Sequence, residues 1–228
     1  MRSLHFKTPA RQLRWHQSPL TSSVVSAALE LLLRQRLDPL DIVAQESART
    51  RSDNDLNPDW DNHPETRPAA VLAPIIKRAS GWTMLFTERS VETPAHPGQI
   101  SFPGGRVQAS DADAVDTALR ETFEEIGLAR SFIEPIGAWD RYDTITGYRV
   151  TPIVALVEPG FDLKLDPREV ASVFEAPLDF LFDPANHEKR EAQWQGRTRY
   201  YYAIPWQGHN IWGATAGMVR ALWERLYA

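Results

Sequence analysis

Apolar and polar positions alternate along the chain with two different periods. Residues 69–76 form an apolar run, and residues 82–87 form a second one after the turn at Ser80 and Gly81, a pattern that predicts a β-hairpin. Further strands are expected at residues 100–102, 132–139, 148–157 and 199–206, and one more opens at residues 166–170. Because segments of helical period lie between these runs, the pattern predicts an α/β fold with a mixed sheet between helical layers.

The helical segments carry apolar residues every three or four positions. This spacing predicts a helix over residues 24–37, closed by Pro39, and a final amphipathic helix near residues 215–226. Short helices are expected over residues 40–49 and 177–182.

The first quarter of the chain differs from the rest in composition. Residues 51–67 are rich in Asp, Asn and Pro and are expected to form a linker. We therefore divide the chain into an N-terminal extension with a helix and a linker, residues 1–66, and a main domain, residues 67–228. The extension either pairs two subunits of a homodimer or covers the active site, or else it is a helical cap packed on its own domain.

The stretch 104–128 carries the clearest chemical pattern. Gly104 and Gly105 precede a helix that Ser110, Asp111 or Asp113 can cap, and Gly127 stands where that helix should stop. An apolar stripe at helical spacing is formed by Val115, Ala118, Leu119, Thr122 and Ile126. Three carboxylates share another face, because Glu121, Glu124 and Glu125 stand at positions i, i+3 and i+4.

Three like charges on one helical turn repel one another, and Arg120 is expected to point off that face. Clustered carboxylates are hard ligands that suit Mg²⁺ or Mn²⁺. A solvated acidic face is the ordinary interpretation of Glu-x-x-Glu-Glu alone, but the glycine loop just upstream favours a bound cation.

This stretch resembles the Nudix box, the signature of the Nudix hydrolases. The residues that carry the resemblance are Gly105 and the run Arg120-Glu121-x-x-Glu124-Glu125-x-Gly127-Leu128. Gly105 lies fifteen residues before Arg120 rather than the motif's fourteen, the motif's upstream Glu is missing with Asp111 nearest, and Thr122 holds a usually apolar position. The resemblance implies an α/β/α sandwich with a mixed sheet.

Flanking stretches resemble the coenzyme A diphosphatase-like branch of that family, which shares the longer spacing. They are residues 85–90, 96–105, 146–152 and 211–216. Pro94 departs from the branch, which usually has a basic residue there. A substrate phosphate is then expected to meet Arg89, His96 or Arg106 beside the backbone of Gly104 and Gly105.

The resemblance implies metal-dependent hydrolysis of a nucleoside diphosphate linked to another group, with coenzyme A or acyl-CoA as the expected substrate. Glu121, Glu124 and Glu125 would be the metal ligands, with Mg²⁺ or Mn²⁺ as cofactor. Glu124, Glu121 or a loop acid would be the general base, and Arg120 would orient the carboxylates. Glu169 is either such a loop acid or an ordinary surface residue.

Composition and charge argue against several classes of function. The charge of −5, with no basic block, argues against nucleic acid as a partner, and the absence of cysteine excludes disulfides and thiolate chemistry. No apolar run is long enough for a membrane span. The basic N-terminus has no acidic residue before Glu30 and is compatible with an organellar transit peptide, but it lacks the apolar core of a secretory signal, and we expect a cytoplasmic protein. His96 and His209 show no recognisable metal-ligand spacing.

Two other functions stay open from the sequence. One is a Nudix pyrophosphatase for ADP-ribose, a nucleotide sugar or a dinucleotide. The other is a non-catalytic nucleotide-binding module, which would have no need of three clustered carboxylates.

Overall fold

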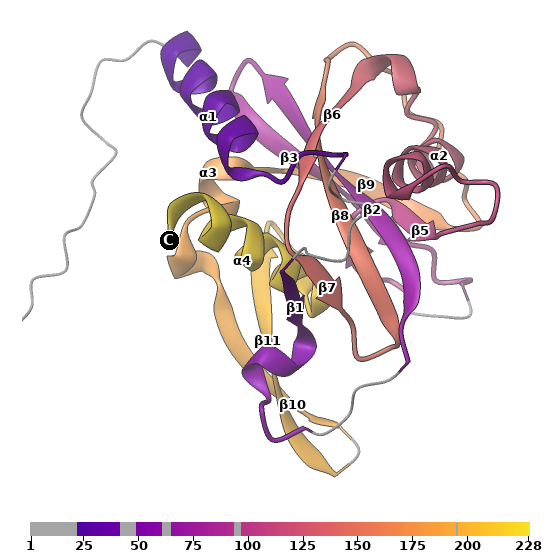
Figure 1. Ribbon diagram of the computed structural model, residues 1–228, viewed down its shortest axis with the longest axis vertical. Coiled ribbons are helices and arrows are strands. Elements are labelled where there is room, and N and C mark those ends of the chain that lie inside the picture. The colour runs from indigo at the N-terminus through magenta and orange to yellow at the C-terminus, as the bar shows by residue number, and fades with distance from the viewer. Residues whose placement is uncertain (1–21, 42–48, 61–64, 94–96, 195) are drawn as a thin grey trace, which may run out of the picture.

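The computed structural model describes residues 22–41, 49–60, 65–93, 97–194 and 196–228 (Figure 1). The helices are α1 Ser22–Arg36, α2 Ala114–Ile126, α3 Leu178–Leu181 and α4 Ala214–Tyr227, with 3₁₀ turns η1 Asp53–Leu56, η2 Arg130–Phe132 and η3 Pro184–Asn186. The larger sheet contains β1 Thr50–Ser52, β2 Arg67–Arg78, β3 Gly81–Arg89, β4 Ile100–Ser101, β5 Gly104–Arg106, β6 Ile133–Ala138, β7 Arg141–Asp143, β8 Tyr148–Val157 and β9 Val170–Pro177. The smaller sheet contains β10 Glu188–Trp194, β11 Arg197–Trp206 and β12 His209–Trp212.

The larger sheet is mixed, and its main order is β1-β7-β8-β2-β3-β4. The long strands β2 and β8 run parallel at its centre, while β3 pairs antiparallel with β2 and confirms the expected hairpin. Off this path, β5 pairs with β2, β6 with β8 and β9 with β3. The strand β5 therefore leaves one edge free in the described part of the chain.

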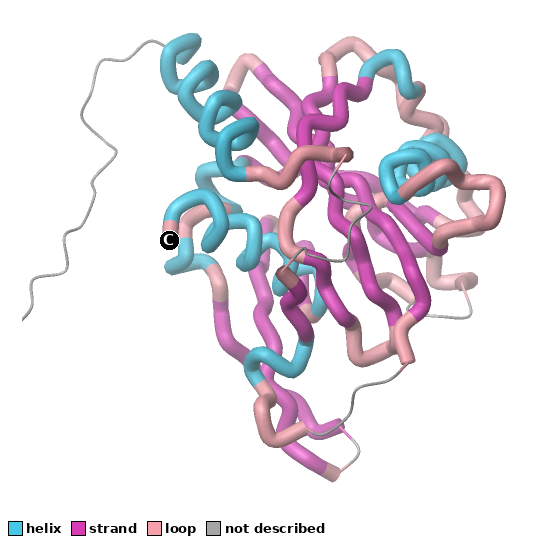
Figure 2. Tube along the Cα trace, viewed as in Figure 1, coloured by secondary structure: helices cyan, strands magenta, loops and turns pink. Residues whose placement is uncertain are grey.

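Alternate residues of β2 face two different helical layers. Ala70 and Leu72 pack with Ala118 of α2, whereas Ala69 and Ala73 belong to the core that α1 and α4 cover. Figures 1 and 2 show α2 on one side of the sheet and α1 and α4 on the other. The α/β/α sandwich expected from the sequence is confirmed.

The N-terminal helix packs on its own chain. Leu33 and Leu37 are buried in the α4 side of the core. Arg225 of α4 binds Asp38 and, at 2.7 Å, the buried Asp140. This is the arrangement expected of a helical cap, and α1 lies on the face of the sheet opposite α2. Pairing of subunits through the extension stays a prediction, and most of the second expected helix falls on residues 42–48, outside the described ranges.

The expected linker over residues 51–67 is wrong for its described part. The strand β1 pairs in parallel with β7, a strand that the sequence did not predict. Asp53 forms an ion pair with Arg199 at 3.0 Å and accepts a hydrogen bond from Tyr142 at 3.1 Å. Tertiary contacts therefore order this polar segment, although the division of the chain at residue 66 stays a prediction.

The small sheet was mostly missed from the sequence. Of its strands, only β11 was expected. The strand β10 was missed because each of its residues is exposed or half-buried and its charged sequence shows no apolar alternation. No helix of the described residues is long and apolar enough to cross a bilayer.

Candidate active site

The glycine loop brings the backbone of β5 close to the helix α2. A Cβ atom on Gly105 would lie 2.5 Å from Cδ of Glu121, and one on Gly104 would lie 2.4 Å from the carbonyl oxygen of Ala70. Gly104 also has a φ of +154°, which favours glycine. Both glycines are therefore required by close approach, one toward the sheet and the other toward a carboxylate.

The helix α2 begins and ends as its sequence predicts. Asp113 caps it by accepting a hydrogen bond from the amide of Asp116 at 2.8 Å, and Gly127 ends it in the left-handed conformation with a φ of +69°. Ala118, Thr122 and Ile126 are buried on its inner face. These contacts fix the rotation of the helix and hence the positions of its three glutamates.

The three glutamates have different surroundings. Glu125 is buried and accepts a hydrogen bond from the amide of Gly104 at 3.2 Å. Glu121 is largely buried, and the side chain of Glu124 is 53% exposed. Burial raises the pKa of Glu125 to about 8, against the hydrogen bond from Gly104, and burial likewise raises the pKa of Glu121.

Arg120 connects the carboxylates, and the expectation that it points off their face is wrong. Its Nη1 donates to Glu121 at 2.8 Å and to Glu124 at 3.0 Å. Its Nε and Nη2 bind the two oxygens of Asp111 at 2.7 and 2.9 Å. The long flexible side chain bends back over the helix, so position on a helical wheel did not predict its reach.

Asp111 anchors the side chain of Arg120. Its carboxylate also accepts hydrogen bonds from the amide of Gln108 and the hydroxyl of Thr117, each at 2.8 Å. The bond from Arg120 holds the pKa of Asp111 well below its usual range. The sequence marked Asp111 only as a possible cap and as the acid nearest to the missing Glu.

The carboxylates fit a divalent cation in charge and ligand type. In the part of the chain that the structure describes, no three acidic or histidine side chains converge on one point, and Glu121 and Glu124 are hydrogen-bonded to Arg120. Glu125, however, is a buried hard oxygen ligand that, among the described residues, accepts a hydrogen bond only from the backbone amide of Gly104. A cation binding here would meet Glu125 directly and compete with Arg120 for the other two.

Arg89 lies near this buried carboxylate. Its charge opposes the rise in the pKa of Glu125, and its buried Nε has no hydrogen-bond partner among the described residues. Glu169 is exposed, and its charge adds to the negative field at Glu121 and Glu125. Pro94 and His96 lie outside the described ranges.

The side chain of Arg106 contacts Tyr148, a neighbour that the sequence did not predict. Its Nε donates to the hydroxyl of Tyr148 at 2.8 Å, and the guanidinium of Arg67 lies over the same ring at 4.5 Å. The three residues come from three different strands, so no local spacing in the sequence could reveal them.

Stretches that are distant in the sequence meet at the glycine loop. The hydroxyl of Thr215, at the start of α4, donates to the carbonyl of Ile100 at 3.0 Å. Tyr148, at the start of β8, binds Arg106 next to Gly105. Of the segments singled out in the sequence, 211–216 and 146–152 thus contact residues on the two sides of the glycine pair, Ile100 before it and Arg106 after it.

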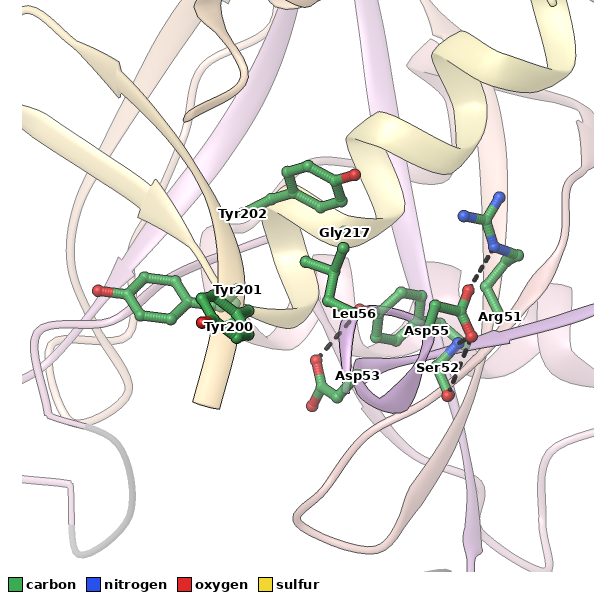
Figure 3. Close-up of a pocket in the computed structure, with 11 residues that line it drawn as sticks. Arg51, Ser52, Asp53, Asp55, Leu56, Tyr200, Tyr201, Tyr202 and Gly217 are labelled. Carbon is green, nitrogen blue, oxygen red and sulfur yellow. Dashed lines mark hydrogen bonds and ion pairs between the residues drawn. The ribbon is translucent and has the colours of Figure 1, made fainter. Parts of the chain in front are cut away.

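Figure 3 shows a small cavity whose lining includes none of the three glutamates of α2. It has a volume of about 20 Å³ and lies between η1, Tyr142, β11 and Gly217 of α4. This is room for about one water molecule, and typical ligand pockets are many times larger. The cavity is therefore not part of the active site.

Comparison with known proteins identifies the family. Residues 66–217 match the model of the NUDIX domain. The Nudix hydrolase NudL of Escherichia coli (strain K12) is 36% identical over 167 residues, which are 73% of this chain and 85% of that protein. NudL of Enterobacter sp. (strain 638) is 36% identical over 156 residues, 68% of this chain and 81% of that protein.

Among solved structures, an Ap4A hydrolase from C. elegans in a binary complex is 22% identical with a TM-score of 0.42, covering 49% of this chain and 80% of that one. Family membership rests on the domain match and on the sequence identity to NudL. By these two findings the chain belongs to the Nudix family and is a Nudix hydrolase, an enzyme that acts on diphosphate anhydride bonds.

Proposed function

We propose that this enzyme hydrolyses coenzyme A or an acyl-CoA at its diphosphate, giving 3′,5′-ADP and (acyl) phosphopantetheine. Nudix hydrolases bind small nucleotide substrates and generally use divalent metal ions. The observation that carries the proposal is the buried carboxylate Glu125 beneath the glycine loop, with the unpaired guanidinium nitrogen of Arg89 beside it. Two stretches that resemble the coenzyme A branch, 146–152 and 211–216, contact Arg106 and Ile100 on the two sides of this loop, which supports this substrate over other diphosphates.

In the proposed site, Glu121, Glu124 and Glu125 would hold Mg²⁺ or Mn²⁺. A cation bound there neutralises charge on the diphosphate and lowers the pKa of water. Arg120 holds the carboxylates of Glu121 and Glu124 in place through its own anchor on Asp111.

Arg89 and the glycine loop have the remaining roles, which concern binding of the diphosphate. Arg89 offers a donor to a phosphate oxygen, and the backbone of Gly104 and Gly105 leaves room for the diphosphate to approach. The hydrolysis joins the oxygen of water to one phosphorus and breaks the bond from that phosphorus to the bridging oxygen. The proton of water passes to Glu124, Glu121 or a loop acid, and the bridging oxygen leaves with the other phosphate.

A substrate panel tests the proposal. The purified chain is incubated with coenzyme A, acetyl-CoA, ADP-ribose, a nucleotide sugar and a dinucleotide, each with Mg²⁺ and then Mn²⁺, and the products are separated by chromatography. Glu124→Gln should abolish release of 3′,5′-ADP, while the matched control Glu158→Gln, at an exposed position outside the site, should retain it.

The pattern of cleavage decides between substrates. Preferential release of 3′,5′-ADP from coenzyme A supports the proposal. Cleavage of ADP-ribose or another nucleotide alone would contradict it and favour a different Nudix pyrophosphatase, which the departure at Pro94 keeps as the alternative. Equal activity of the Glu124→Gln and Glu158→Gln variants would contradict the assignment of the carboxylates.

A further inference from the structure

Two arginines share one tyrosine ring at the end of the large sheet. The guanidinium carbons of Arg67 and Arg106 lie 4.5 and 5.3 Å from the ring centroid of Tyr148. The hydroxyl of Tyr148 accepts a hydrogen bond from Nε of Arg106 at 2.8 Å, which fixes this guanidinium at the ring edge. Two like charges are thus held close together on one half-buried aromatic side chain.

This pair has no acidic counterpart within the described ranges, where no carboxylate lies in ion-pair distance of Arg67 or Arg106. The next residue along β8 shows the contrast, because Arg149 binds both oxygens of Asp143 at 2.8 Å. Most other arginines of the described chain likewise have acidic partners. Two adjacent exposed guanidiniums without one have donors left for an anion.

The registers of the strands explain why the two arginines meet. Arg67 lies opposite Tyr148 in the parallel pair of β2 and β8, and Ala69 lies opposite Arg106 in the antiparallel pair of β2 and β5. Residues two apart on a strand share a face, so Arg67, Arg106 and Tyr148 lie together on one face of the sheet.

The arginine pair is close to the catalytic carboxylates. Arg106 directly follows Gly105, whose Cβ position touches the carboxylate of Glu121, and the carbonyl of Arg106 accepts a hydrogen bond from Arg120 at 3.2 Å. The carboxylates lie on the α2 side of β5 and the arginine pair on the other side. Because β5 pairs only with β2 among the described strands, a flexible ligand at its free edge reaches both places.

We propose that Arg67, Arg106 and Tyr148 form a binding subsite for a phosphomonoester of the substrate, separate from the diphosphate that is cleaved. The inference rests on the proposed function, in which that group is the 3′-phosphate of coenzyme A. A phosphate dianion has oxygens enough for both guanidiniums, and arginine binds phosphate in a bidentate manner that lysine does not reproduce. Tyr148 acts as a positioning residue that orients Arg106.

Binding without turnover tests the subsite independently of the reaction. Calorimetry measures the affinity of the full chain for adenosine 3′,5′-bisphosphate, for AMP, which lacks the 3′-phosphate, and for inorganic phosphate. Loss of a hydrogen bond to a charged group weakens binding about tenfold or more. We expect Arg67→Met and Arg106→Met each to weaken the bisphosphate about tenfold, with a much smaller effect on AMP.

Two further variants sharpen the comparison. Arg149→Met removes the same charge one residue beyond Tyr148 and should leave bisphosphate binding unchanged, which controls for net charge. Tyr148→Phe should weaken the bisphosphate less than Arg106→Met, because it removes only the bond that orients the guanidinium. If inorganic phosphate binds as tightly as the bisphosphate, the site is a general anion site and the proposal is wrong.

The outcomes separate this proposal from the proposed function. Bisphosphate affinity that is unchanged in Arg67→Met and Arg106→Met would overturn the subsite, even if coenzyme A is cleaved. Affinity lost in both variants but kept in Arg149→Met would support it, even if coenzyme A is not cleaved. Where coenzyme A is a substrate, the ratio of kcat/KM for coenzyme A over dephospho-coenzyme A should fall about tenfold in each arginine variant.

Discussion

Replacing Gly105 with alanine should damage the chemistry and leave the fold intact. The new Cβ would lie 2.5 to 2.7 Å from the carboxylate atoms of Glu121, whereas ordinary contacts begin at 3.4 Å. The carboxylate must therefore retreat by about 0.7 to 0.9 Å, and it can do so because it is the end of a flexible side chain. A displacement of about 1 Å at a catalytic group can reduce the rate about a hundredfold.

Gly104→Ala is the matched substitution one residue earlier, and its expected effect is the opposite. Its Cβ would meet the carbonyl of Ala70 and the Cα of Val71 at 2.4 and 2.6 Å, and neither backbone atom can move freely. The positive φ adds about 1 to 3 kcal/mol of strain. For a chain of this size, each kcal/mol lowers the melting temperature by about 2 to 4 °C.

Thermal melting and hydrolysis are measured on both variants, with Gly160→Ala as a control that has a positive φ but open space around it. We expect kcat to fall about a hundredfold in Gly105→Ala, with a melting temperature near that of the wild type, and the melting temperature to fall most in Gly104→Ala. Wild-type kcat in a folded Gly105→Ala would refute the reasoning, as would a melting temperature that falls as far as in Gly104→Ala.

Two further predictions concern titration and metal binding. Since burial raises the pKa of Glu125 from the ordinary 4.5 to about 8, this side chain lowers stability as the pH rises from about 4.5 to about 8, with no further loss above that value. In chelator above pH 8, Glu125→Gln should melt at or above the wild-type temperature, and Mg²⁺ should raise the melting temperature of the wild type alone; an equal rise in both would contradict the metal assignment. Burial lowers the pKa of His187, whose Nε2 lies 2.7 Å from the carbonyl of Leu181. Its neutral form is therefore favoured in the fold, and stability should be lost as the pH falls below about 6.5. His187→Gln should show a shallower loss of melting temperature from pH 8 to 5, and parallel curves would contradict this.

The elements that form the core were predictable from the sequence because their signals are local. The apolar run that becomes β2, the strand β8 and the helix α2 with its caps at Asp113 and Gly127 each follow from adjacent residues. The elements that were missed depend on distant partners. The strand β1 pairs with β7 across the chain, and β10 is held by backbone bonds to β11 with charged side chains that give no period.

In the candidate site, too, features set by local sequence were predictable and features set by distant partners were not. The sequence placed Glu121, Glu124 and Glu125 on one turn of a helix, because helical spacing fixes where side chains leave the backbone. The sequence could not predict the position of the Arg120 side chain, because this long side chain is oriented by its hydrogen-bond partners. It also could not predict the contacts of Tyr148 with Arg67 and Arg106. Those contacts depend on strand registers, and a register is set by pairing over the whole sheet.

The site holds more negative charge than its own residues neutralise. Among the described residues, Arg120 is the one guanidinium bonded to Asp111, Glu121 and Glu124, and Glu125 accepts a hydrogen bond only from the amide of Gly104. If all four carboxylates are ionised, this arginine leaves three formal negative charges, and Arg89 reduces them to two. Buried like charges oppose folding, so the arrangement costs stability whenever nothing else binds. A divalent cation bound by these carboxylates would remove that cost and attract a diphosphate. The proposed function would then also stabilise the carboxylate cluster.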